Sequence, residues 1–190
     1  AFAGLALAAG WVVLCWHARH DALDEGWRYA ERSGIAAVEV EAMPRPASPY
    51  NWTVAVFDGE RYHVADLNVR RKTPLVAGAD ASFVRRLSAA YQPAATAAWR
   101  VLPRFGDGSD AHWVRAAWQH EALATYRWFA AAPVLVKAVE RPAAGGGTER
   151  CAVFADLRFG FPGHDEAPIR YGVCLNGDDD ATLVKLAGGE

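Results

Sequence analysis

Cysteine and net charge are both scarce in this 190-residue sequence. Three cysteines are too few for a disulfide-dense scaffold. Twenty lysines and arginines stand against 22 aspartates and glutamates, so the chain lacks the basic excess of a general nucleic-acid binder. A hydrophobic share of 52% excludes an intrinsically disordered chain. These exclusions leave a folded chain. Its length suits one domain, since a domain typically contains roughly 100–200 residues.

Motifs of the common catalytic centres are also missing: there is no HExxH, P-loop, GxGxxG, GxSxG or CxxC pattern. Six histidines remain to be interpreted. His17 and His20 share a helix face with Asp21 and can supply two metal ligands, but we interpret them as polar residues at a membrane–water boundary. His63 is expected on a solvated strand face and His164 in an exposed loop. We therefore assign no metal and no cofactor to these residues; a free-standing metallohydrolase using His17 and His20 is the alternative.

The first 16 residues, AFAGLALAAGWVVLCW, carry no charge. A membrane span needs about 20 such residues, and tryptophans like Trp11 and Trp16 prefer the membrane–water interface. We expect residues 1–33 to form one helix that stops at Gly34, with its first half the end of a membrane span and its second half polar. An alanine-rich core helix of a soluble protein is the alternative.

The rest of the chain, residues 34–190, is expected to form a single soluble α+β domain. Segregated blocks of helices and strands favour a largely antiparallel mixed sheet with two or three further helices. The Asp58-Gly59 turn predicts a hairpin over residues 51–69. Helices are expected over residues 81–91, 94–102 and 110–131. Further strands are expected over residues 35–43, 133–142, 151–161, 169–176 and 181–188, and a proline-rich loop over residues 43–52.

Two pairs of residues invite a chemical interpretation. Cys151 and Cys174 fall on strands that can be neighbours, so a bridge is conceivable, but free buried thiols are our expectation, as for Cys15. Asp156 and Arg158 lie two apart on one predicted strand and so share a face. They can pair with each other or line a polar pocket, and we expect a structural pair.

Two stretches, PRPASPYNWTVAVFDGERYHVADLNV and VFADLRFGFP, together resemble a known family. They are similar to segments of the bacterial membrane-bound metal-dependent hydrolase-like proteins, in which a proline-rich loop after the last membrane helix leads to a strand pair, and an Asp-Leu-Arg-aromatic strand follows later. The matching positions are Pro44, Pro46, Pro49, Trp52, Tyr62, Asp156, Leu157, Arg158 and Phe159. The order of the elements agrees over nearly the whole chain.

The resemblance implies that this chain is the C-terminal soluble domain of a bacterial inner-membrane protein. The family's presumed metal-binding residues lie in upstream membrane helices, so a divalent metal would belong to the full-length protein and not to these residues. The implied partners are the membrane and those helices; no nucleic acid is expected, and the small-molecule substrate is not identified. Arg19, Arg28 and Arg32 favour the cytoplasmic side.

In this interpretation the domain covers or regulates an active site formed by the upstream helices. Trp52, Tyr62, Asp156 and Arg158 are the candidate binding residues. The alternative is a non-enzymatic, membrane-anchored binding or scaffolding module, in which some of the eight tryptophans form a groove for a ligand or partner.

Overall fold

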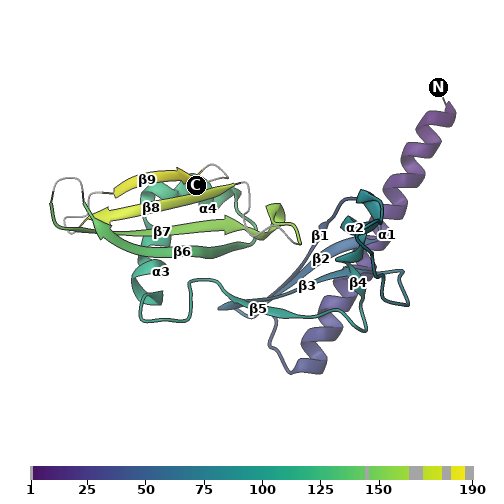
Figure 1. The fold of residues 1–190 in the computed structure, drawn as a ribbon, viewed down its shortest axis with the longest axis horizontal. Coiled ribbons are helices and arrows are strands. Elements are labelled where there is room, and N and C mark those ends of the chain that lie inside the picture. Colours follow the sequence, from purple (N-terminus) through teal and green to yellow (C-terminus); the bar gives the residue numbers. More distant parts are fainter. Residues whose placement is uncertain (1, 144–145, 163–168, 177–180, 187–190) are drawn as a thin grey trace. The chain divides into compact units, whose positions relative to one another are not determined.

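The structure is a computed structural model that describes residues 2–143, 146–162, 169–176 and 181–186 (Figure 1). It confirms the expected α+β class, with a long N-terminal helix and mostly antiparallel sheets. The chain forms two compact units, residues 1–101 and 102–190, each with its own sheet. The boundary expected from the sequence lies elsewhere, between residues 1–33 and a single domain over residues 34–190. The N-terminal helix lies within the first unit, because its second half packs on that unit's sheet.

The first unit is a helix packed on a sheet of five strands (Figure 1). Strands β1, β2 and β3 form an antiparallel meander, β4 pairs in parallel with β3, and β5 also pairs with β3. The expected hairpin is confirmed: Asp58 N–H donates to the Arg61 carbonyl over 3.1 Å, and Gly59 has φ +104°. The elements are α1 (Phe2–Ser33), β1 (Glu39–Pro44), β2 (Asn51–Phe57), β3 (Arg61–Asn68), α2 (Phe83–Ala89), β4 (Gln92–Pro93) and β5 (Arg100–Pro103).

Helix α1 is continuous, as expected, and ends before Gly34, which has φ +65°. Its two halves differ in their surroundings. Up to Trp16 its large apolar side chains are mostly exposed to solvent, and it is long and apolar enough to cross a membrane. Beyond that point, small residues at every fourth position are buried against the sheet: Ala18, Ala22, Gly26 and Ala30. Residues four apart share one helix face, so this stripe lets the backbones of helix and sheet approach closely.

The second unit packs short helices on one face of a four-stranded antiparallel sheet in the order β6-β7-β8-β9. Its core joins Trp118 and Tyr126 from the helices to Phe154 and Val173 from the sheet. The elements are α3 (Ala111–Gln119), η1 (Glu121–Leu123), α4 (Ala124–Phe129), β6 (Pro133–Pro142), β7 (Thr148–Asp156), η2 (Leu157–Phe159), β8 (Arg170–Asn176) and β9 (Ala181–Leu186).

Three expected elements differ from the structure. Residues 94–102 do not form a helix; after a turn, the chain pairs with β3 as β5, since edge pairing outweighs the helix propensity of the alanines. The expected helix 110–131 is interrupted at His120, whose Nδ1 accepts the Ala122 N–H over 3.1 Å and caps a new turn. The expected strand 151–161 ends at Asp156, which caps the turn η2.

Gly26 should be essential for the contact between α1 and the sheet. A Cβ atom at this position would lie 2.5 Å from Val40 Cγ1 and 2.9 Å from Val54 Cγ1. Overpacking costs about 1–3 kcal/mol, whereas Gly→Ala in a helix gains at most about 1 kcal/mol from propensity. Gly26→Ala should therefore lower the free energy of unfolding, measured by urea denaturation in mild detergent.

Gly10→Ala is the matched control, because nothing lies within 4 Å of its added Cβ. It should leave stability unchanged or raise it by up to about 1 kcal/mol. Equal stabilities of the two variants would contradict the close approach of α1 to the sheet.

Candidate functional site

The candidate residues are divided between the two units. Trp52 and Tyr62 belong to the first unit, and Asp156 and Arg158 to the second. Even the first two are separated by the sheet. Trp52 shares its face with Val54 and packs toward α1, whereas Tyr62 is paired with Phe57 and lies on the other face. Trp52 and Tyr62 therefore cannot line one groove.

Trp52 holds the proline-rich loop in place. Its ring is 4% exposed and packs in the core beneath α1, and its Nε1–H donates to the Pro49 carbonyl over 3.0 Å. Beside it lies a pocket of about 440 Å³, here called the proline-loop pocket, lined by Trp11, Cys15, Pro44–Pro49 and Trp52. Tyr62 is also buried and stacks on Phe57, with ring centroids 4.6 Å apart. Of the two candidates, only Trp52 borders this pocket.

A buried polar cluster that the sequence analysis did not find occupies the opposite face of the first sheet. Thr53 Oγ1 donates to Asp66 Oδ1 and accepts from Arg45 Nε over 2.6 Å. Arg100 Nη1 lies 2.8 Å from the other carboxylate oxygen of Asp66. Near this cluster, burial raises the pKa of Tyr91 to about 12; the Asp66 charge adds to the rise and the Arg45 charge opposes it. The carboxylate thus pairs with the Arg100 guanidinium and is linked through Thr53 to Arg45, and the cluster ties the proline-rich loop to the sheet.

A carboxylate–imidazole–phenol chain links the hairpin to α1. His63 Nε2 lies 3.5 Å from Asp58 Oδ2, and His63 Nδ1 lies 3.3 Å from the Tyr29 hydroxyl. His63 is expected on a solvated strand face, but it points toward α1 and its side chain is only 13% exposed. Tyr29 stacks on Trp99 with 3.7 Å between ring centroids. A carboxylate that orients an imidazole is the arrangement of a general base, but here its members bind one another across a helix–hairpin junction.

Acidification should weaken this junction through Asp58. Burial tends to raise the Asp58 pKa, but hydrogen bonds from the Glu60 and Arg61 N–H groups and from His63 outweigh it, so the pKa lies below 3.8. A lowered folded-state pKa means that the carboxylate stabilises the fold above the unfolded pKa, and that this contribution is lost as the pH falls through the folded one. Asp58→Asn should thus be less stable than wild type near neutral pH, and the difference should shrink in acid.

The measurement is the free energy of unfolding of both proteins at about pH 7 and about pH 3. Asp107→Asn, at an exposed carboxylate, is the control and should follow wild type at both values. A difference between Asp58→Asn and wild type that does not change with pH would contradict the assignment.

Asp156 and Arg158 form the expected structural pair, although not as strand neighbours. The Asp156 side chain is fully buried; its Oδ2 accepts from Arg158 Nε over 2.9 Å and from the Ala131 N–H over 2.9 Å. Its Oδ1 accepts the Arg158 N–H and thereby turns the chain into η2. The guanidinium lies over the rings of Phe129 and Phe159, at 4.8 and 5.3 Å. The contacts with Ala131 and Phe129 join the end of β7 and η2 to the C-terminal end of α4, and the other contacts fold the chain into η2.

Asp156→Ala should therefore destabilise the second unit by about 2–4 kcal/mol, because it removes the carboxylate that accepts from two partly buried N–H groups and pairs with the Arg158 guanidinium. The check is the urea unfolding midpoint. Glu140→Ala is the control on the same sheet, since the Glu140–Arg150 pair is more than half exposed on both sides and should contribute under about 1 kcal/mol. Equal urea unfolding midpoints of Asp156→Ala and wild type would refute the structural role.

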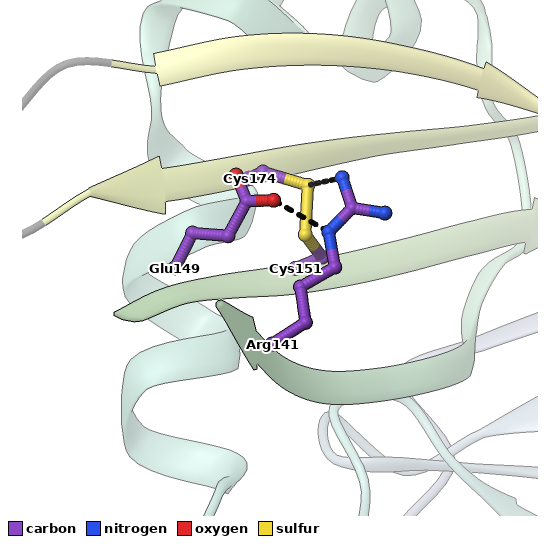
Figure 2. Close-up of a disulfide and its surroundings, with 4 residues drawn as sticks. All are labelled: Arg141, Glu149, Cys151 and Cys174. Carbon is purple, nitrogen blue, oxygen red and sulfur yellow. Dashed lines mark hydrogen bonds and ion pairs between the residues drawn. A yellow bond between two sulfur atoms is a disulfide. The ribbon is translucent and has the colours of Figure 1, made fainter. Parts of the chain in front are cut away.

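The cysteine expectation is wrong for two of the three residues (Figure 2). Cys151 and Cys174 stand directly opposite each other on β7 and β8, with Cα atoms 3.9 Å apart, and form a disulfide. Beside it, Arg141 Nε lies 2.5 Å from Glu149 Oε1, and its Nη2 lies 3.6 Å from Cys174 Sγ. Strand register, which no local pattern specifies, brought the sulfurs together. Cys15 is free, as expected.

Among the described residues, only one group of three or more potential ligands is close enough to hold a metal ion: Glu149, Cys151 and Cys174. The two sulfurs are bonded to each other, so they are not thiolate ligands in this state. His17 and His20 contact the Trp16 ring instead, with centroids 5.0 and 4.3 Å away. The expected loop position of His164 lies outside the described residues.

The second unit carries an apolar pocket of about 390 Å³ that the sequence analysis did not locate. Tyr126 is buried in its wall, and burial and the Asp156 charge raise the pKa of this phenol, so it stays protonated. Trp128 of the same helix is 86% exposed. The lining residues are Ala122, Thr125, Tyr126, Phe129, Ile169, Tyr171 and Leu183.

No known family model, no curated protein and no solved structure matches this chain. The resemblance to the membrane-bound hydrolase-like proteins therefore stays a prediction from short motifs.

Proposed function

We propose that this chain is a membrane-anchored accessory domain of a membrane-bound metal-dependent hydrolase-like protein. The observation that carries the proposal is the continuity of α1: an exposed apolar half passes without a break into a half that is packed on the first sheet. Leu7 and Val12 are exposed apolar side chains. Their transfer from water into a bilayer lowers the free energy of the system. Any tilt or rotation of the anchored helix is then passed directly to the first unit.

The roles of the candidate residues support an accessory function over a catalytic one. Trp52 fixes a loop, Tyr62 fills a sheet face, and Asp156 with Arg158 closes a junction. All four stabilise the fold. The metal implied by the resemblance does not fit the described residues, where it would find only Glu149 beside two cysteines bonded to each other. The reaction centre would therefore lie in the upstream membrane helices, with its substrate still to be identified.

The disulfide also indicates on which side of the membrane the domain lies. Buried disulfides persist in oxidising compartments and are rare in the cytosol. Against this, Arg19, Arg28 and Arg32 favour the cytoplasmic side, but two of them lie beside acids, Arg19 near Glu41 and Arg28 near Glu25. The charge rule also compares two flanks of a span. The disulfide is the stronger indication, and we propose that the domain lies on the side of the bacterial inner membrane that faces away from the cytoplasm.

Cell fractionation with thiol counting tests both parts. In cells that make the protein from its own gene, the protein should stay in the membrane after alkaline extraction. Alkylation before lysis should block Cys15 alone, and reduction should then release Cys151 and Cys174. A protein found in the soluble fraction would overturn the anchor, and three free thiols would overturn the placement. Full metal-dependent hydrolase activity in residues 17–190 alone would overturn the accessory role.

The second candidate is a non-enzymatic, membrane-anchored binding module, and the apolar pocket of the second unit favours it. Apolar pockets of about 300–1,000 Å³ with a few polar groups are typical of small-molecule sites. This function needs no upstream active site. It would be preferred if the domain bound an apolar ligand in this pocket while the full-length protein showed no hydrolysis.

A further inference from the structure

The proline-loop pocket lies where the exposed half of α1 meets the folded part of the first unit. Trp11 and Cys15 contribute its helix wall; they are one turn apart and therefore on the same helix face. Trp11 and the neighbouring Trp16 are each more than half exposed, at the polar end of the apolar run. In a bilayer this is the level at which tryptophans lie, so the pocket would open at the membrane surface.

The loop that forms the other wall exposes few polar backbone groups. Pro44, Pro46 and Pro49 have no N–H. The N–H groups of Arg45 and Asn51 donate to the carbonyls of Asn51 and Ser48, over 2.9 and 3.2 Å.

Other groups of the loop are satisfied in the same way. Tyr50 N–H donates to Ser48 Oγ over 3.2 Å, and the Pro46 and Pro49 carbonyls accept from the Asn51 and Trp52 side chains, each over 3.0 Å. Backbone that faces lipid must satisfy its hydrogen bonds internally, and most of this loop does so.

The residues that line the proline-loop pocket indicate which part of a lipid, the acyl chain or the headgroup, fits it. Among the described residues that line the pocket there is no carboxylate, and the one charged residue among them, Arg45, is 6% exposed and directs its Nε to Thr53 on the sheet. The remaining lining is formed by tryptophans, prolines and small side chains. Such walls suit a hydrocarbon chain and not a phosphate group.

We propose that the proline-loop pocket holds an acyl chain of a bilayer phospholipid. This inference rests on the proposed anchoring by α1, since only a chain held at the bilayer presents the pocket to lipid. The occupant follows from continuity: the wall formed by Trp11 and Cys15 is part of the same exposed apolar helix surface that requires a bilayer. The site would fix the depth of the first unit at the membrane.

The test is photocrosslinking of the whole chain in vesicles of phosphatidylcholine and phosphatidylglycerol. A small share of the phosphatidylcholine carries a diazirine on one acyl chain, and adducts are located by mass spectrometry of peptides. We expect adducts on residues 44–52 as well as on residues 2–10 of α1. Cys15→Phe fills the pocket and should lower the adducts on 44–52 by about tenfold, which corresponds to about 1.4 kcal/mol.

Val13→Phe is the matched control, because Val13 is exposed on the same helix and does not line the pocket. A second pair covers the case in which Cys15→Phe does not fold: Trp11→Ala removes a pocket wall, whereas Trp16→Ala does not. Trp11→Ala alone should reduce the loop adducts.

The outcomes separate this inference from the anchoring on which it rests. Adducts on residues 2–10 alone would overturn the acyl site and leave the anchor intact. No adducts anywhere would overturn both. Crosslinks from the loop to a second copy of the chain in place of lipid, or equal losses in the pocket and control variants, would also overturn the acyl site.

Discussion

The first unit depends on the close packing of small α1 residues against the sheet. Ala18, Ala22, Gly26 and Ala30 present almost no side-chain volume, so Val40 and Val54 contact the helix backbone at Gly26. A helix held this closely cannot shift without opening the core. The position of the proline-rich loop follows from the same contact, because Trp52 extends from this core to the loop. So does the Tyr29–His63–Asp58 chain, which joins the same two elements one turn further along α1.

Buried charges in this protein serve the fold. Asp66 and Asp156 are both nearly inaccessible, and each carboxylate has an arginine and further hydrogen-bond donors around it. Burying a carboxylate without such partners would destabilise the fold far more than burying an apolar side chain at the same position. These clusters join loops to sheets at points where regular pairing ends. In the second unit this explains why Asp156 and Arg158, which the motif resemblance picked out, have structural contacts.

Features that depend on local signals could be predicted from the sequence, whereas features decided by a distant segment could not. Helix α1 and the hairpin around Asp58-Gly59 were predicted because periodicity and turn residues lie within a few positions of each other. The segment 94–102 was assigned to a helix on its alanines, yet the edge of β3 recruited Arg100–Pro103 as a strand. His120 was predicted to lie inside a helix, but its ring caps the next turn, η1. The Asp156–Arg158 pair was predicted correctly, but not the turn that forms it.

By itself the sequence determined the long helix, its apolar and polar halves, the hairpin and the α+β class, because each depends on periodicity along a continuous stretch. Tertiary structure alone decided the division at residues 101 and 102, the partner of His63 and the bond between Cys151 and Cys174. Those features depend on which strand lies beside which and in what register. Both the neighbouring strand and the register are set by the order of strands in the sheet, and contacts between residues far apart in the sequence establish that order.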